Sequence, residues 1–214
     1  MSRKRTAVLI SGRGSNMSAL ISAAQSPDYP AEVALVLSNR PDAKGLERAA
    51  ENGIPTTVVD HKLFSGDRQA FEKAVDDILK EHRIELVALA GFMRILTPYL
   101  VDAWANRMIN IHPALLPSFK GLETHERALS EGVKLHGATV HYVSSEMDDG
   151  PIIMQGAIPV LDTDTPDTLA ARVLEVEHRI YPKALELVAS GQAKVSGARV
   201  ETGDADASGM LIFP

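Results

Sequence analysis

The 214-residue chain has no cysteine, one tryptophan and only 5% aromatic residues, and its net charge is −6. Without cysteine it offers no disulfide bonds and no thiolate metal ligands, which fits a reducing cytosol. Because basic residues are not in surplus, the composition favours neither nucleic acid nor an anionic membrane as a partner. The apolar stretch at residues 7–10 is too short for a signal peptide or a membrane span. We therefore expect a soluble cytoplasmic protein in which any anion is bound at a local site.

The chain does have the composition of an ordinary globular domain, with 45% apolar and 23% charged residues. Apolar runs and helical patterns alternate through its first half. Strands are expected over residues 6–10, 32–37, 56–59, 85–90 and 108–111, and helices over 17–25, 44–52 and 67–81. This alternation predicts an α/β fold, a single Rossmann-like domain with a mostly parallel, doubly wound sheet and right-handed crossovers.

The pattern changes after Pro113. Residues 137–143 and 152–157 read as two strands that add to the sheet in antiparallel fashion. A long helix is expected over 165–190, which Pro182 would kink or divide. We expect one domain over residues 1–190, with residues 191–214 forming a small hairpin or a tail that packs on the same domain.

Asn110 and His112 form the most informative pair of residues, at the end of a short apolar strand. Strand side chains alternate between faces, so these two point the same way. An amide donor beside an imidazole suits a reaction in which negative charge builds on a carbonyl oxygen while a proton moves nearby. Asp148 lies in a tight Asp-Asp-Gly-Pro turn. It either serves the turn alone or reaches His112 and favours the imidazolium.

A glycine-containing loop, residues 11–16, separates the first strand from the first helix. Ser15 or Asn16 is expected to cap that helix, whose N–H groups would face an anion. The loop is neither a Walker A motif nor a full dinucleotide fingerprint. On its own, it fits either a phosphate site or a capped turn without a ligand.

Residues 91–98 follow the fourth strand at its carboxyl end, where open α/β sheets bind ligands. This apolar run, broken by Arg94, suits a flat hydrophobic ligand or, alternatively, a loop that simply covers the core. His136 and His141 match no zinc signature, so we expect no metal site. We interpret His141 as a structural histidine and expect His61 and His82 at the surface.

Taken together, these segments resemble the folate-dependent formyltransferases, in particular the glycinamide ribonucleotide (phosphoribosylglycinamide) formyltransferases. The resemblance spans about residues 6–190. It rests on residues 10–16, 89–96, 110–117, 136–141 and 148–151, which occur in the order typical of that family. The resemblance implies transfer of a formyl group from the co-substrate 10-formyltetrahydrofolate to the primary amine of glycinamide ribonucleotide, in de novo purine biosynthesis.

The resemblance also assigns roles to individual residues. It implies that Asn110, His112 and Asp148 are catalytic. The implied ribonucleotide site comprises Gly14, Ser15 and Asn16 for the phosphate and Glu177 for the ribose. The implied folate site comprises Met93, Arg94, Ile95 and Leu96 at the pterin, Asn110 near the reacting group and Arg68 at the glutamate tail.

Two residues depart from the family pattern. Asp149 stands where relatives often have glycine, and Leu174 where a polar contact to ribose or phosphate is common. The rival enzyme is formyltetrahydrofolate hydrolase, which shares the Asn-His-Asp chemistry but usually has an extra N-terminal domain. Methionyl-tRNA formyltransferase would add a basic RNA-binding domain. A non-catalytic nucleotide-binding module is a third alternative, although it leaves the pair of Asn110 and His112 unexplained.

Overall fold

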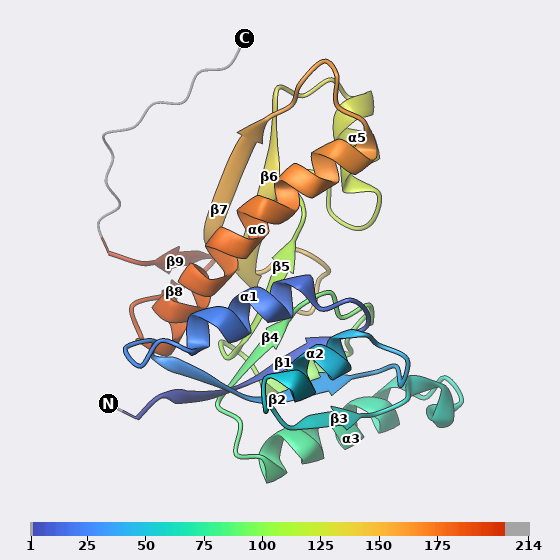
Figure 1. Ribbon diagram of the computed structural model, residues 1–214, viewed down its shortest axis with the longest axis vertical. Coiled ribbons are helices and arrows are strands. Elements are labelled where there is room, and N and C mark those ends of the chain that lie inside the picture. Colours follow the sequence, from blue (N-terminus) through green and yellow to red (C-terminus); the bar gives the residue numbers. More distant parts are fainter. Residues whose placement is uncertain (1, 204–214) are drawn as a thin grey trace.

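The computed structural model describes residues 2–203, and a seven-stranded sheet runs through it (Figure 1). The strand order is β3-β2-β1-β4-β5-β6-β7. Five strands are parallel: β1 (Lys4–Ile10), β2 (Ala31–Ser38), β3 (Thr56–Val58), β4 (Leu86–Leu89) and β5 (Met108–His112). The other two, β6 (Leu135–Tyr142) and β7 (Ile152–Pro159), are antiparallel. The predicted parallel sheet with an antiparallel addition is thereby confirmed.

Helices cover both faces of this sheet. One face carries α1 (Ser15–Ala24), α2 (Gly45–Glu51) and α6 (Pro166–Ala189), and the other carries α3 (Arg68–Glu81) and α4 (Pro98–Ala103). A short helix, α5 (Thr124–Ser130), and a 3-10 turn, η1 (His61–Phe64), complete the described helical elements. The sequence interpretation missed α4, α5 and η1, which span only four to seven residues and so give a weak helical period.

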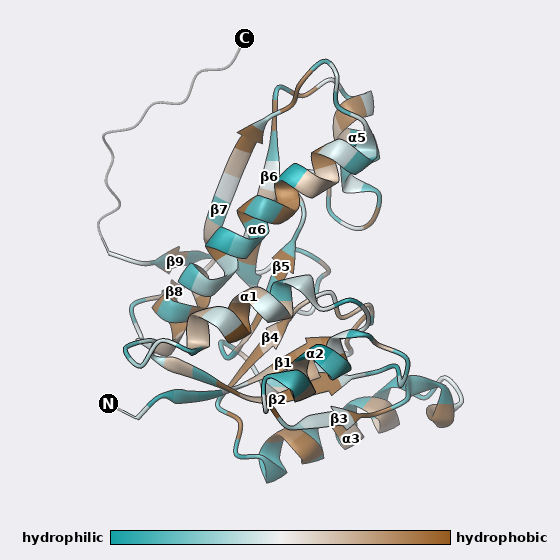
Figure 2. Ribbon diagram, viewed as in Figure 1, coloured by the Kyte–Doolittle hydropathy of each residue, from teal (hydrophilic) through white to brown (hydrophobic). Residues whose placement is uncertain are grey.

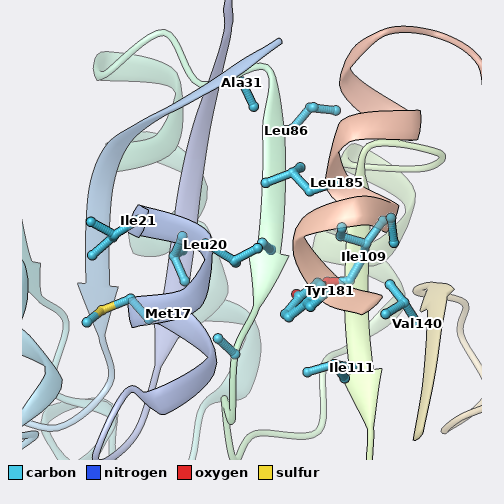
Figure 3. Close-up of a cluster of buried hydrophobic side chains, with 14 of the residues drawn as sticks. Met17, Leu20, Ile21, Ala31, Leu86, Ile109, Ile111, Val140, Tyr181 and Leu185 are labelled. Atoms are coloured by element: carbon cyan, nitrogen blue, oxygen red, sulfur yellow. The ribbon is translucent and has the colours of Figure 1, made fainter. Parts of the chain in front are cut away.

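Strand alternation divides the core into two layers. On β1, Val8 and Ile10 pack toward α1 and α6, whereas Ala7 and Leu9 pack toward α3. Figure 3 shows the first layer, in which side chains of α1 and α6 meet those of β4, β5 and β6. Figure 2 shows hydrophobic colouring along the central strands and hydrophilic colouring on outward helix surfaces. Burial on both faces explains why the parallel strands read as continuous apolar runs.

The long C-terminal helix is continuous through Pro182, so the expected division of this helix is wrong. Tyr181, Ala184 and Leu185 are all fully buried on either side of the proline and hold both halves against the sheet. The Tyr29 hydroxyl donates a hydrogen bond to the Pro182 carbonyl at 2.6 Å. Tertiary packing therefore outweighs the local cost of the missing backbone N–H.

A small hairpin follows this helix, formed by β8 (Lys194–Ser196) and β9 (Arg199–Glu201). Val195 and Val200 pack against the core layer below α6. The remainder of the expected C-terminal segment, residues 204–214, lies outside the described residues. Within residues 2–203, no helix is both long and apolar enough to cross a membrane.

Candidate active site

The site forms where the strand order reverses. β1 pairs with β2 on one side and β4 on the other, so the loops after β1 and β4 diverge from the same edge of the sheet. A cavity of about 830 Å³ opens at this edge and extends along the end of β5. Its lining includes Asn16, Met93, Arg94, Ile95, Leu96, Asn110, His112, His141, Asp148 and Glu177. Residues from six separated segments of the chain thus share one cavity.

Asn110 is held by a histidine on the neighbouring strand. Antiparallel pairing of β5 with β6 places Asn110 directly opposite His141, and Asn110 Nδ2 lies 3.3 Å from His141 Nε2. His141 Nδ1 faces the Tyr142 carbonyl oxygen at 2.8 Å, so that nitrogen carries the proton. Burial lowers the pKa of His141, which keeps the ring neutral. Its free Nε2 lone pair therefore accepts from the Asn110 amide and fixes the orientation of that amide.

His112 lies between two hydrogen-bond acceptors. Its Nε2 donates to the Phe119 carbonyl oxygen at 2.9 Å, and its Nδ1 lies 3.4 Å from Oδ2 of Asp148. The ring is buried, with 5% of its surface exposed. A neutral imidazole can donate to only one of these acceptors, whereas an imidazolium can donate to both. The arrangement therefore provides one acceptor for each ring nitrogen, with Nδ1 directed toward the carboxylate.

Asp148 reaches His112 because the turn that carries it is pressed against β6. A side chain at Gly150 would place its Cβ 1.7 Å from the Tyr142 carbonyl oxygen, so only glycine permits this approach. The Gly121 amide donates to Asp148 Oδ2 at 2.9 Å and anchors the carboxylate through the same oxygen that faces His112. The extra carboxylate, Asp149, forms an ion pair with Lys120, which offsets the added negative charge beside Asp148.

The glycine loop contacts the long helix. Gly14 adopts a left-handed conformation (φ +72°) as the N-cap of α1, and no side chain caps the helix, so the expected Ser15 or Asn16 cap is wrong. Instead, Asn16 Nδ2 donates to Glu177 Oε2 at 2.5 Å. Burial raises the pKa of Glu177, and the hydrogen bond from Asn16 opposes that rise. The first amides of α1 remain without intrahelical partners, as at any helix N-terminus.

The residues expected near folate divide into two groups. Met93 and Ile95 expose 64% and 62% of their surface, and both line the cavity together with Leu96. The Arg94 guanidinium lies 5.8 Å from the centre of the Phe71 ring, which holds it at the cavity wall. Arg68, by contrast, is exposed at the start of α3 and is not among the residues that line the cavity.

Three contributions were not foreseen from the sequence. His141 was interpreted as structural, yet it contacts Asn110 and lies 3.9 Å from Asp148. The backbones of Phe119 and Gly121 hold His112 and Asp148. The role of His141 depends on the register of β5 against β6, which the sequence does not reveal. The contacts of Phe119 and Gly121 are made by backbone groups, which every residue has and which therefore leave no signal in a sequence. Within residues 2–203, no group of three or more His, Cys, Asp or Glu residues is arranged to hold a metal ion.

Comparison with known proteins gives a consistent result. The formyl transferase family pattern matches residues 4–185. The trifunctional purine biosynthetic protein adenosine-3 of Gallus gallus is 50% identical over 194 residues, which are 91% of this chain and 19% of that protein. This chain thus spans about a fifth of that relative. Phosphoribosylglycinamide formyltransferase of Haemophilus influenzae is 41% identical over 192 residues, 90% of each chain. The crystal structure of glycinamide ribonucleotide transformylase 1 from Symbiobacterium toebii matches with a TM-score of 0.91 and 44% identity, over 94% of this chain and 95% of that one.

Proposed function

The chain belongs to the formyl transferase family, and on that basis we propose that it transfers a formyl group from 10-formyltetrahydrofolate to the amine of glycinamide ribonucleotide. One observation carries this proposal. Asn110, His112 and Asp148 meet on the wall of a single cavity. Its lining also includes the polar pair Asn16 and Glu177, which we call the polar end, and the apolar side chains of Met93, Ile95 and Leu96, which we call the apolar end. Such a cavity accommodates two dissimilar substrates on either side of one reacting carbonyl group.

The ribonucleotide is assigned to the polar end. Glu177 and Asn16 face this part of the cavity, and their carboxyl and amide groups suit the hydroxyls of a ribose. The N-terminus of α1, with the amides of Ser15 and Asn16, suits the phosphate because helix N-termini attract anions. Leu174 is half-buried on α6 and does not line the cavity, so it supplies no contact in this arrangement.

The folate is assigned to the apolar end. Met93, Ile95 and Leu96 present apolar side chains that a flat pterin covers on binding, which removes their surface from water. The carboxylate tail then extends toward solvent, where Arg94 and the more distant Arg68 are its nearest assigned cations.

The proposed reaction begins when the amine nitrogen attacks the formyl carbon, and negative charge develops on the formyl oxygen. Asn110 and the His112 Nδ1–H stabilise this oxyanion. The Phe119 carbonyl occupies His112 Nε2, so the Nδ1 proton serves this purpose and is shared between the oxyanion and Oδ2 of Asp148, which it faces before the substrates bind. Asp148 orients the His112 ring and, through a water molecule, carries a proton from the attacking amine to N10 of the folate, which leaves as its bond to the formyl carbon breaks.

The decisive experiment follows 10-formyltetrahydrofolate consumption by the purified protein. Turnover should occur only when glycinamide ribonucleotide is present, and formylated ribonucleotide should appear in equal amount. Equal consumption in the absence of the amine would assign the chain to the hydrolase instead. No consumption under either condition would favour a binding module. A cytoplasmic location and the absence of a nucleic-acid partner remain predictions.

A further inference from the structure

A short loop positions both His112 and Asp148. Residues 119–123 have no regular secondary structure and lead into α5. The Phe119 carbonyl oxygen accepts a hydrogen bond from His112 Nε2 at 2.9 Å, and the Gly121 amide donates to Asp148 Oδ2 at 2.9 Å. Because the loop makes both contacts with backbone groups, its conformation sets where the two catalytic side chains lie.

The backbone of this loop is in a conformation that its surroundings must hold. Phe119 and Glu123 both have a φ of +57°, and Gly121 between them has a φ of +82°. Glycine adopts such values freely, whereas the left-handed region is unfavourable for residues that carry a side chain. A strained conformation of this kind persists only where neighbouring groups fix it.

Two side chains restrain the ring of Phe119. Phe119 is buried, and its ring lies edge-to-face against that of His136, with 5.8 Å between the ring centres. The Cζ atom of Arg127 lies 5.5 Å from the centre of the same Phe119 ring. His136 is fully buried on β6, and a guanidinium is attracted to an aromatic ring that it covers. The Phe119 side chain is therefore fixed by one core residue and by Arg127.

Arg127 also binds the backbone of the loop. Its Nη1 donates to the Lys120 carbonyl oxygen at 2.7 Å and lies 3.4 Å from the Leu122 carbonyl oxygen. One guanidinium thus contacts the loop at three points. The arginine extends from α5, which packs against α6 (Figure 1), and its neighbour Ala128 is fully buried in that cluster. Arg127 therefore joins the loop to a fixed part of the core.

We propose that Arg127 is a positioning residue for formyl transfer, because it holds the loop that places His112 and Asp148. This inference rests on the proposed function, which makes these two residues catalytic. Arg127 is not among the residues that line the active-site cavity, so it acts on the reaction through the loop. Its removal should lower kcat and leave the KM values for both substrates nearly unchanged.

Steady-state kinetics test this role. Arg127→Ala should lower kcat by about tenfold, since small displacements of catalytic groups are costly, and should change each KM by less than about twofold. Arg127→Lys should lower kcat by only about threefold, because an ammonium can donate to a carbonyl but has no planar group to cover the ring.

Arg107→Ala is the matched control. Arg107 likewise covers an aromatic ring, that of Trp104 at 4.6 Å, and donates to a carbonyl oxygen, that of Ala103 at 2.7 Å. It precedes β5, whereas His112 is the last residue of that strand. This variant should keep the kcat of the wild-type protein. Thermal unfolding should show that the Arg107 and Arg127 variants are both folded at the assay temperature.

A double mutant separates positioning from a general effect on the fold. In protein that already carries Asp148→Asn, Arg127→Ala should lower kcat by no more than about twofold, because the pair that Arg127 positions is already broken. Hydrogen exchange of the full chain without substrates adds a readout that does not depend on activity. Exchange of the Gly121 amide should be about tenfold faster in Arg127→Ala and unchanged in Arg107→Ala.

An unchanged kcat in Arg127→Ala would overturn the proposal, and so would an undiminished loss in the Asp148→Asn background. Unchanged exchange of the Gly121 amide would also overturn it. Faster exchange in a protein that transfers no formyl group to glycinamide ribonucleotide would refute the proposed function and sustain the hold of Arg127 on the loop.

Discussion

Oδ2 of Asp148 lies 3.4 Å from His112 Nδ1 and accepts a hydrogen bond from the Gly121 amide at 2.9 Å. One carboxylate oxygen is thus held by a backbone amide and also faces the imidazole. The Phe119 carbonyl completes the arrangement at the opposite nitrogen of the ring. Residues 119–121 contact both His112 and Asp148 through their backbone. The separation of these two side chains is therefore set by that loop as well as by β5 and by the turn that carries Asp148.

Replacing Asp148 with asparagine should lower kcat by about a hundredfold or more, with little change in the KM for glycinamide ribonucleotide. The asparagine amide cannot accept a proton from the attacking amine through water, as the carboxylate does in the proposed reaction. Asp149→Asn is the matched control, because this neighbouring carboxylate pairs with Lys120 and should be dispensable for turnover. Near-normal turnover by the Asp148 variant would remove this residue from the mechanism.

Asn110→Ala should also lower kcat by about a hundredfold, because it deletes one donor to the oxyanion. His141→Ala leaves the Asn110 amide in place and removes only the acceptor that orients it. We expect a smaller loss, of about tenfold, from that variant. Steady-state kinetics of both proteins would measure the difference. A greater loss in the His141 variant would show that the histidine does more than orient Asn110.

The stability of Glu177→Gln, compared with that of the wild-type protein at the same pH, should increase as the pH rises. The raised pKa of Glu177 means that its contribution to stability is fully present below about pH 4.5, its ordinary pKa, and is lost as the pH rises through the raised value. Glutamine has no such transition, so Tm of the variant minus Tm of the wild type should increase over this interval. A constant difference across the interval would contradict the raised pKa. Weaker ribonucleotide binding by the same variant would support the ribose assignment.

Asp76→Asn should destabilise the fold by about 1–3 kcal/mol in urea unfolding at neutral pH. This buried carboxylate accepts hydrogen bonds from Lys80 on the same helix and from Tyr99 and Trp104, and the last two join α3 to α4 and its C-cap. Burial would raise the pKa of Asp76, but these hydrogen bonds outweigh it and lower the pKa. The stabilisation is therefore present above the ordinary pKa of the group and is lost as the pH falls through the lowered value. Asp77→Asn, on the exposed side of α3, is the control and should change stability little.

Folate binding should slow hydrogen exchange in residues 144–151. This loop lines the active-site cavity with Ser144, Glu146 and Met147, and it carries Asp148. Ligand contacts should add to the hydrogen bond from Gly121 and to the ion pair with Lys120. Identical protection with and without tetrahydrofolate would mean that the loop is already ordered before the ligand arrives.

Local patterns were sufficient for much of this fold. The apolar runs at β1, β2, β4 and β5 predicted a parallel sheet because both of its faces are buried. The change of pattern after Pro113 predicted the antiparallel strands. Short elements such as α4 and α5 were missed, since their boundaries depend on packing and on buried partners such as Glu72, which accepts hydrogen bonds from Thr97 at the start of α4.

By itself, the sequence determined which chemical groups this protein has and on which face of a strand Asn110 and His112 lie. Alternation along a strand is a local property, so spacing alone is sufficient to establish it. Only the tertiary structure decided which partners the side chains of Asn110 and His112 contact. The register of β5 against β6 brought His141 opposite Asn110, and the turn at Gly150 brought Asp148 to His112. These pairings join residues 31 and 36 positions apart, and they form only when the strands and the turn are assembled.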